Sequence, residues 1–530
     1  MKQLLTNYKY QILLAIMWLV AFVVVWPVGE FAINDDWSFA KNVYHLTVQH
    51  EFVIDTWPSM NLISQTLFGT AITSVFGFSH TVLRVSIFLL AFISSQTLFR
   101  LLYTLSGKQA FTAFLFTAAL CFNPLYLHLA MTYMTDVFFV SLLIFAMHAL
   151  VNYSIHGHTR AYLFFCVWIV LALLCRQHAI LFSLLIVPGA LKHGKTKLQK
   201  VVLAILPLLF CWQAGHQYLH YLAEHHIGNG IQQMRDIQGY VLQVPLHIQL
   251  LQGADQLLVA AHLALPWSLL LFILNKGFTT KKDWFRFLFC LLLAVLLTVK
   301  DLGYYPIGNI SDIFEIGPRM LKGSHRPLSE QNDRWFRILT YAMALFSLSL
   351  ILFVLFFRVK HKAHRLYTSK GFLFFAGVGI LYLVFVAMSK AYFDRYVLPL
   401  SLLLSILLIP QNSASNSRWK YLLGGLVLLI YLNSVIQNLD YFNWQKTRQK
   451  AISYLEAKGV SGQQIDGGFE FNGWIKNKVP YPTKPGLSWW WVMDDKYTVS
   501  GRKIEGHVVD TVFVYRRYLP FRNDTVFVLN

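Results

Sequence analysis

Long apolar runs, separated by short polar segments, follow one another along most of this 530-residue chain. A run of about 18 or more apolar residues is long enough to cross the hydrocarbon core of a membrane as a helix. Hydropathy, checked against the placement of charge, predicts an all-α polytopic membrane protein with about thirteen membrane-spanning helices. These helices are expected at 11–28, 81–104, 110–130, 135–153, 161–175, 178–191, 200–222, 256–274, 284–299, 338–358, 371–389, 396–410 and 420–438.

Two apolar stretches contain polar residues that change the predicted topology. Segment 59–77 is rich in Ser, Thr, Asn and Gln, so we expect a helix that lies in the membrane interface, in the first outer loop, rather than one that crosses the membrane. The long run 161–191 is interrupted by Arg176, Gln177 and His178. Because an arginine in the middle of a bilayer is costly, we expect this run to form a tight hairpin whose tip reaches the outer surface.

The chain changes character after residue 438. An amphipathic helix is expected at 444–458, and the segments Val512–Tyr515 and Thr525–Leu529 have the alternation of short strands. The pattern predicts a transmembrane domain at 1–438 followed by a small extracytoplasmic α/β domain at 439–530. A unit of about 90 residues is near the low end for independent folding, so we expect it to lean on the membrane part.

Lysine and arginine exceed aspartate and glutamate by 45 to 25, which gives the chain a net charge of +20. Such an excess also occurs in proteins that bind nucleic acid. Here, however, the basic residues fall in short loops between apolar runs, and with the N-terminus in the cytoplasm the inner loops hold about twenty of them against one acid, Asp283. We therefore expect a multi-pass protein of the cytoplasmic (inner) membrane, with an extracytoplasmic C-terminal domain and no nucleic-acid partner.

Cysteine usage excludes one class of site. All five cysteines fall inside apolar runs, where thiols behave as small hydrophobes. Neither a disulfide framework nor a cysteine metal site is predicted.

Two adjacent acids, Asp35 and Asp36, follow the first apolar run in the segment NDDWSFA. One interpretation is helix capping, because a helix that begins at Trp37 would use one such side chain. The other is a general base that accepts a proton from an attacking hydroxyl. The like-charged neighbour would then raise the pKa of one of the two carboxyls.

A third acid, Asp136, stands at the outer start of a predicted span. It too has a capping interpretation. An aspartate at a membrane boundary is nevertheless costly unless it is paired or faces water. On this topology Asp136 lies on the same face of the membrane as Asp35.

Cationic side chains in the outer segments are candidates for binding a phosphate. Singly, each is a typical snorkelling or headgroup-binding residue. Together they could neutralise a phosphate leaving group, and arginine offers two parallel hydrogen bonds for that purpose. No residue is assigned to a metal, although Glu224 and His225 are adjacent and the acidic side chains would accept a divalent cation.

Three segments in order are similar to one enzyme family: NDDWSFAKNVYHL in the first outer loop, the Pro58-led interfacial stretch that ends in a Phe-Gly turn, and TYMTDVFFVSLLIF after the third span. They resemble the GT-C glycosyltransferases of the family 39 or aminoarabinose-transferase type, and YFDRYVLPL at 392–400 resembles a later motif of that family. In this resemblance Asp35 matches the catalytic acid, Asp36 its acidic neighbour and Asp136 the second acidic site. The donor-phosphate candidates are Arg84, Arg176, His178, Lys390, Arg395 and Tyr396.

The resemblance implies transfer of a sugar from a polyprenyl-phosphate donor to a lipid, glycan or protein acceptor, by a monomer embedded in membrane lipids. The expected course is inversion by single displacement, with Asp35 deprotonating the acceptor and Asp36 or Asp136 orienting it or a bound cation. One departure is that Trp57 precedes Pro58 where aminoarabinose transferases have a lysine. The sugar and the acceptor of those enzymes are therefore not carried over.

Two other classes fit the same composition. A transporter or flippase would also be polytopic and basic on its inner side, but it would place ionisable groups near the bilayer midplane on repeated, broken helices. A non-catalytic scaffold would use an exposed aromatic patch, for which Trp489–Trp491 is the candidate.

Overall fold

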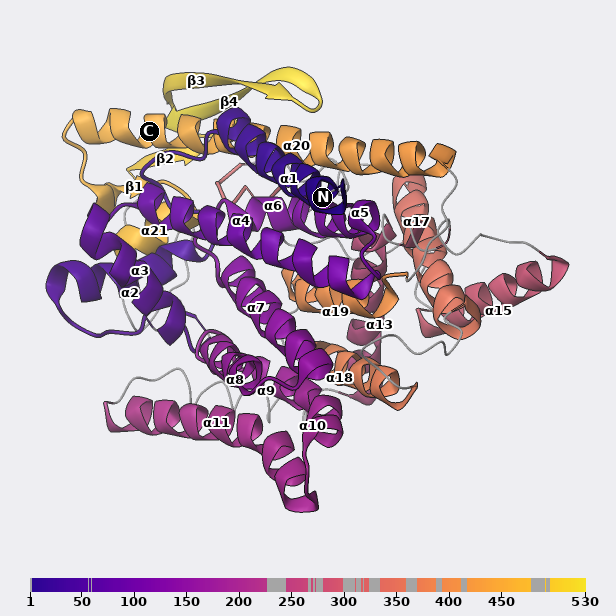
Figure 1. Cartoon of the computed structure of the whole chain (residues 1–530). Helices are drawn as coiled ribbons and strands as arrows, with labels where there is room; N and C mark the ends of the chain where they lie inside the picture. Colours follow the sequence, from indigo (N-terminus) through magenta and orange to yellow (C-terminus); the bar gives the residue numbers. More distant parts are fainter. Residues whose placement is uncertain are drawn as a thin grey trace.

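Figure 1 shows the computed structural model of the chain. It describes residues 2–55, 57–58, 60–225, 245–265, 268–269, 272, 280–298, 310, 316–317, 319–323, 334–358, 369–387, 393–410, 417–477, 491 and 496–530. The helices are α1 (Lys2–Val25), α2 (Asp36–Tyr44), α3 (Ile63–Phe76), α4 (His80–Leu105), α5 (Ala110–Cys121), α6 (Pro124–Ala130), α7 (Thr135–His156), α8 (Thr159–Leu173), α9 (Ala179–Ser183), α10 (Val187–His193), α11 (Lys197–Glu224), α13 (Leu246–Leu263), α15 (Lys281–Leu297), α17 (Arg334–Phe353), α18 (Ser369–Ala387), α19 (Leu398–Leu408), α20 (Ser417–Ala457) and α21 (Phe469–Lys476).

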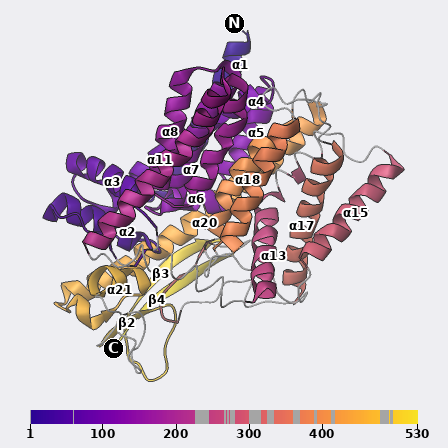
Figure 2. The ribbon, with the colours of Figure 1, turned by 90° about the horizontal axis from the view of Figure 1, so that it is seen from below.

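The predicted all-α membrane part with a small C-terminal α/β unit is confirmed. Within the described residues, six helices are long and apolar enough to cross a membrane, or seven if one bent pair counts as a single span. Several other predicted spans form shorter apolar helices of 10–17 residues. Figure 2 shows the C-terminal sheet and α21 at one end of the helix bundle, with the N-terminus at the other end.

The predicted break in the run 161–191 is confirmed: α8 ends at Leu173 and α9 begins at Ala179. The last carbonyls of a helix need donors from outside it, and residues at the start of α3 and just before it supply them. Asn61 Nδ2 donates to the Leu173 carbonyl over 2.7 Å, and Ser64 Oγ donates to the Leu171 carbonyl over 2.8 Å. The polar residues of this segment therefore cap α8. At 14 residues, α3 extends about 21 Å and is too short to cross a membrane, which agrees with the interfacial prediction.

Two other segments differ from expectation in where the helices end. The run 110–130 forms two helices, α5 and α6, that meet at 70°. Asn123 caps the second helix and Pro124 opens it, a combination that starts a new helix. Conversely, the two helices expected at 420–438 and 444–458 form the continuous 41-residue α20, which is about 60 Å long. The expected domain boundary at residue 438 thus lies inside a helix.

The C-terminal sheet packs along α20, as Figure 1 shows. Its strands are β1 (Ile465–Asp466), β2 (Tyr497–Ser500), β3 (Val509–Tyr518) and β4 (Phe521–Leu529), in the order β1-β2-β4-β3. Strands β3 and β4 contain both predicted strand segments and pair antiparallel. Asp440 of α20 accepts the backbone N–H groups of Tyr518 and Leu519 over 2.7 and 2.8 Å. The long helix therefore helps to tie the sheet to the membrane part.

Helix α21 of the C-terminal unit packs against α2 and the loop before it. Lys41 Nζ donates to the Gly473 carbonyl over 2.9 Å, and a Cβ at Gly473 would come within 2.5 Å of the Trp37 ring. Glu470 accepts the Asn34 N–H over 3.3 Å and also pairs with Arg448 of α20. The C-terminal unit consequently holds the loop that carries the two adjacent acids.

Candidate active site

Asp35 lies in the loop between α1 and α2 and is the most exposed of the three predicted acids, with a side chain 20% exposed. Its Oδ2 accepts a hydrogen bond from Arg395 Nη2 over 3.2 Å, and its Oδ1 accepts one from the Trp57 indole over 3.0 Å. Asp35 occupies the residue before α2, but its side chain makes no capping hydrogen bond. The capping interpretation therefore does not account for this residue.

Asp36 turns into the protein and is 2% exposed. Its Oδ1 accepts the Ile33 N–H over 2.6 Å, and its Oδ2 accepts the Tyr133 N–H over 3.1 Å. Burial raises the pKa of Asp36 to about 7, against the opposing charge of Arg84. The expected rise of one pKa is thus present, but burial rather than the neighbouring carboxylate is its main cause. With both oxygens on backbone amides, Asp36 joins two loops instead of facing an acceptor.

Asp136 lies in the first turn of α7 and pairs with the arginine of the hairpin turn. Arg176 Nη2 contacts Asp136 Oδ1 at 2.7 Å, and Arg176 Nε donates to Thr135 Oγ1 over 2.9 Å. Both charged side chains are at most 2% exposed. A buried arginine is tolerated where a carboxylate compensates it, which explains why the sequence breaks its apolar run at this point. Asp136 Oδ1 thus accepts from Arg176, and Asp136 Oδ2 has no hydrogen-bond partner among the described residues, so neither oxygen caps α7.

Arg395 joins Asp35 and Asp136. It lies in a short 3-10 turn, Asp394–Val397, that leads into α19. Its Nε is 3.7 Å from Asp136 Oδ2 and its Nη2 is 3.2 Å from Asp35 Oδ2, while its side chain is 1% exposed. Among the residues that the structure describes, its Nη1 has no hydrogen-bond partner. A buried donor without an acceptor costs about 1–3 kcal/mol, so this position favours an incoming anion.

Asp394 supports this turn and was not singled out in the sequence. Its Oδ1 accepts the Arg395 N–H over 2.8 Å, and its Oδ2 accepts the Ile310 N–H over 2.9 Å. Its place beside Arg395 in the DRY segment was the only signal that could have identified it.

Tyr396 and His178 line the same cluster through their rings. The guanidinium carbons of Arg176 and Arg395 lie 5.5 and 5.9 Å from the centre of the Tyr396 ring, within the range of cation–π attraction. His178 packs edge-on against Phe385 and Tyr382 at 4.9 and 6.1 Å. Burial and the Arg176 charge lower the pKa of His178 to about 3. His178 is therefore neutral near pH 7, which corrects its assignment to the cationic set.

Arg84 has a different role from the one expected. Its Nη1 donates to the Pro27 carbonyl over 2.8 Å and its Nη2 to the Phe31 carbonyl over 2.6 Å. Its guanidinium lies over the Phe31 and Phe442 rings. Both amino groups are thus occupied by the loop that leads to Asp35, and Arg84 clamps that loop instead of binding phosphate. Lys390, the remaining candidate, lies outside the described residues.

Four aromatic side chains form a wall beside Asp35. Trp57 packs against Trp37, Phe469 and Trp491 with ring centres 5.9, 5.6 and 5.2 Å away. Trp57 remains 39% exposed, whereas Trp491 is 2% exposed. The expectation of an exposed patch is therefore wrong for Trp491, while residues 489–490 lie outside the described residues. Trp57 was noted in the sequence only because it occupies a position where a lysine was expected. The structure shows that its indole N–H donates a hydrogen bond to Asp35.

The cluster does not have the composition of a metal site. In the described part of the chain, no three His, Cys, Asp or Glu side chains are grouped so that they could hold a metal ion. Arg395 contacts both Asp35 and Asp136 and so supplies the positive charge between them. The residues present therefore fit an ion-pair network better than a cation site.

Comparisons with known proteins found structural similarity but no match in sequence. No protein-family model matches the chain, and no curated protein matches it. Among solved structures, the chain is similar to the crystal structure of ArnT from Cupriavidus metallidurans bound to undecaprenyl phosphate, with 11% identity and a TM-score of 0.43. The similarity covers 87% of this chain and 81% of that chain.

Proposed function

We propose that this chain is a membrane glycosyltransferase of the GT-C type. It would transfer a sugar from a polyprenyl-phosphate donor to a lipid, glycan or protein acceptor on the outer side of the cytoplasmic membrane. The observation that carries the proposal is the buried network of Asp35, Arg395, Asp136 and Arg176. In it one carboxylate reaches solvent, and one amino group of Arg395 has no hydrogen-bond partner among the described residues.

Asp35 is the proposed general base. It is the only one of the three acids with substantial exposure, so an acceptor hydroxyl can approach it. The hydroxyl oxygen attacks the anomeric carbon and its proton passes to a carboxylate oxygen of Asp35, while the bond from that carbon to the phosphate oxygen breaks. A single displacement of this kind inverts the anomeric configuration. General base catalysis by a positioned carboxylate contributes about 10²–10⁴-fold to rate.

Arg395 is the proposed ligand of the leaving phosphate. Its Nη2 holds Asp35, while its Nη1 has no partner in the described residues. The same guanidinium can therefore orient the base and offset the charge that develops on the polyprenyl phosphate. Removing one preorganised donor of this kind from an active site costs about 2.7–4 kcal/mol in the transition state.

Asp136, Arg176 and Asp36 are proposed to position these two groups. Asp136 contacts both arginines and thereby fixes Arg395 in the orientation that reaches Asp35. Asp36 connects the loop of Asp35 to the start of α7 through the backbone of Tyr133. Neither acid needs to touch a substrate in this scheme.

The placement of charge favours this proposal over transport. Asp136 is at the first turn of α7, and Arg176 and Arg395 stand in turns between helices. Transporters usually bring ionisable groups to broken helices near the bilayer midplane. The network instead lies at helix ends, where an aqueous acceptor and a lipid-linked donor can meet.

The proposal is tested with the purified full chain in lipid vesicles and a polyprenyl phosphate that carries a labelled sugar. We expect time-dependent release of polyprenyl phosphate with a transferred sugar of inverted anomeric configuration, measured by mass spectrometry and NMR. Uptake of the labelled lipid or of a free solute without cleavage of the sugar–phosphate bond would instead support the transporter.

A further inference from the structure

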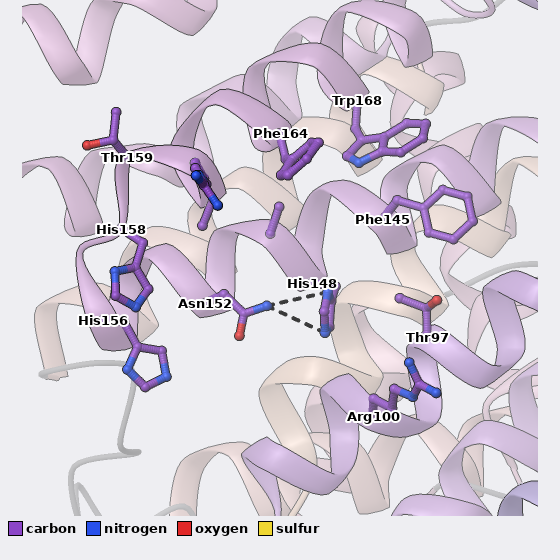
Figure 3. A pocket seen from close by; sticks show the side chains of 13 residues that line it. Thr97, Arg100, Phe145, His148, Asn152, His156, His158, Thr159, Phe164 and Trp168 are labelled. Atoms are coloured by element: carbon purple, nitrogen blue, oxygen red, sulfur yellow. Dashed lines mark hydrogen bonds between the residues drawn. The ribbon is translucent and has the colours of Figure 1, made fainter.

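A cavity of about 880 Å³ lies among α4, α7 and α8, far from the acidic network (Figure 3). Its lining includes Asn152 of α7, which is 16 residues beyond Asp136. A helix rises about 1.5 Å per residue, so the two positions are about 24 Å apart along α7. The cavity and the proposed active site therefore lie at opposite ends of the same apolar helix, separated by most of a bilayer's hydrocarbon thickness.

One part of the cavity is cationic and contains no acid. Arg100 near the end of α4 and Arg160 at the start of α8 both line it, and no Asp or Glu side chain does. Neither arginine forms an ion pair with an acid in the described ranges. Figure 3 shows Arg100 on one side of the cavity and His156 and His158 on the opposite side, with Asn152 and His148 between them. The polar lining thus comes from three helices and offers donors to an anion.

The other part of the cavity is aromatic and continues into a lipid-facing surface. Phe145 and Trp168 pack with ring centres 5.0 Å apart, and Phe164 of α8 is 58% exposed. On α4, Leu89 and Ile93 are each 53% exposed. They precede Arg100 at helical spacing and so share its face. An apolar chain that leaves the cavity along this face would meet exposed hydrocarbon side chains instead of water.

We propose that this cavity binds an anionic glycerophospholipid of the inner leaflet. The phosphate lies between the guanidiniums of Arg100 and Arg160, since arginine binds phosphate oxygens through two parallel hydrogen bonds. The acyl chains follow Phe164 and the exposed face of α4. A soluble phosphate compound would make no use of that aromatic and aliphatic edge. The cavity lies about 24 Å along α7 from Asp136, so a lipid-linked donor held in the cavity would be out of reach of the proposed active site.

The test is native mass spectrometry of the full chain, purified in detergent and given equal amounts of phosphatidylglycerol and phosphatidylcholine. We expect the wild-type chain to retain phosphatidylglycerol at least about tenfold in excess, and the double variant Arg100→Gln/Arg160→Gln to retain the two lipids equally. The matched control is Lys195→Gln/Lys197→Gln, which removes two exposed charges from the same end of the bundle outside the cavity. This control should keep the wild-type preference.

Three results would overturn the proposal. The first is equal retention of the two lipids by the wild-type chain. The second is an unchanged preference in the arginine variant together with a native elution profile. The third is displacement of phosphatidylglycerol by millimolar inorganic phosphate, or by an equimolar amount of polyprenyl phosphate, which would assign the cavity to another ligand. Because wild-type selectivity is measured first, the first and third results can overturn the proposal even if the arginine variant does not fold.

Discussion

Replacing Arg395 by glutamine separates catalysis from stability. Arg395 contacts Asp35 at 3.2 Å and Asp136 at 3.7 Å. In the variant, Asp136 keeps its 2.7 Å contact with Arg176, and Asp35 keeps the Trp57 indole and its exposure to water. No buried charge is therefore left alone, and we expect the free energy of unfolding to fall by about 1–3 kcal/mol. The loss of the phosphate donor should lower kcat by about 10²–10³-fold.

Arg176→Gln is the matched comparison. It removes the short contact of Asp136 and leaves that buried carboxylate with only the 3.7 Å approach of Arg395. Breaking a buried pair in this way costs about 3–5 kcal/mol. Arg176→Gln should accordingly lower the thermal unfolding midpoint more than Arg395→Gln does.

The assay measures kcat for sugar release per folded molecule, with the folded fraction taken from thermal unfolding in detergent. The reasoning is refuted if Arg395→Gln retains kcat within about threefold of wild type, far short of the loss of one preorganised donor. It is also refuted if its activity falls only in proportion to its folded fraction. Either result would make Arg395 a structural ion-pair partner and leave the phosphate without a ligand in this network.

Three further substitutions test the surroundings of the network. The raised pKa of Asp36 favours the protonated carboxyl in the folded state and contributes about 4 kcal/mol of stability for a shift from 3.8 to about 7. This stability should be present below about pH 4 and lost as the pH rises to about 7. Asp36→Asn should flatten the dependence of the unfolding free energy on pH, measured by thermal unfolding, and an unchanged dependence would contradict the assignment. Trp57→Phe removes the indole N–H that donates to Asp35 but keeps an aromatic ring. A hydrogen bond to a charged group contributes about 1.5–3 kcal/mol, and this one is partly exposed, so kcat should fall by about tenfold. A change in KM alone would count against a role of this hydrogen bond in catalysis. Glu470→Gln leaves Arg448 buried without its carboxylate partner, so the unfolding free energy measured by calorimetry should fall by about 3–5 kcal/mol. Backbone hydrogen exchange at residues 30–36 should also become faster. Unaltered exchange there would show that the C-terminal unit does not hold the loop.

The helices were largely predictable because the length of an apolar run in lipid is a strong constraint. The hairpin break at Arg176 followed from the cost of an unpaired arginine, but its partner Asp136 could not be named, since pairing depends on tertiary placement. The bend at Asn123–Pro124 carried a readable signal, a cap followed by proline, that hydropathy alone ignores. The continuity of α20 through residues 439–443 was also readable, because that segment contains neither glycine nor proline.

The candidate site shows where sequence reasoning stops. Asp35, Asp136, Arg176 and Arg395 come from four distant segments, and the structure brings them together. Arg84 was grouped with them because a cation at an outer helix start fits phosphate as well as backbone carbonyls, and only the contacts distinguish the two. The opposite orientations of Asp35 and Asp36 were equally hidden, since neighbouring residues in a loop have no fixed periodicity.

The central claim is that Asp35 removes the proton from the acceptor. It is tested most directly by sugar transfer with Asp35→Asn beside Glu51→Gln, which removes an exposed acid from the segment between α2 and α3. Both variants should insert into the membrane like the wild-type chain. We expect turnover to fall by about 10²–10⁴-fold in Asp35→Asn and to stay unchanged in Glu51→Gln. Near-normal turnover in Asp35→Asn would contradict the account.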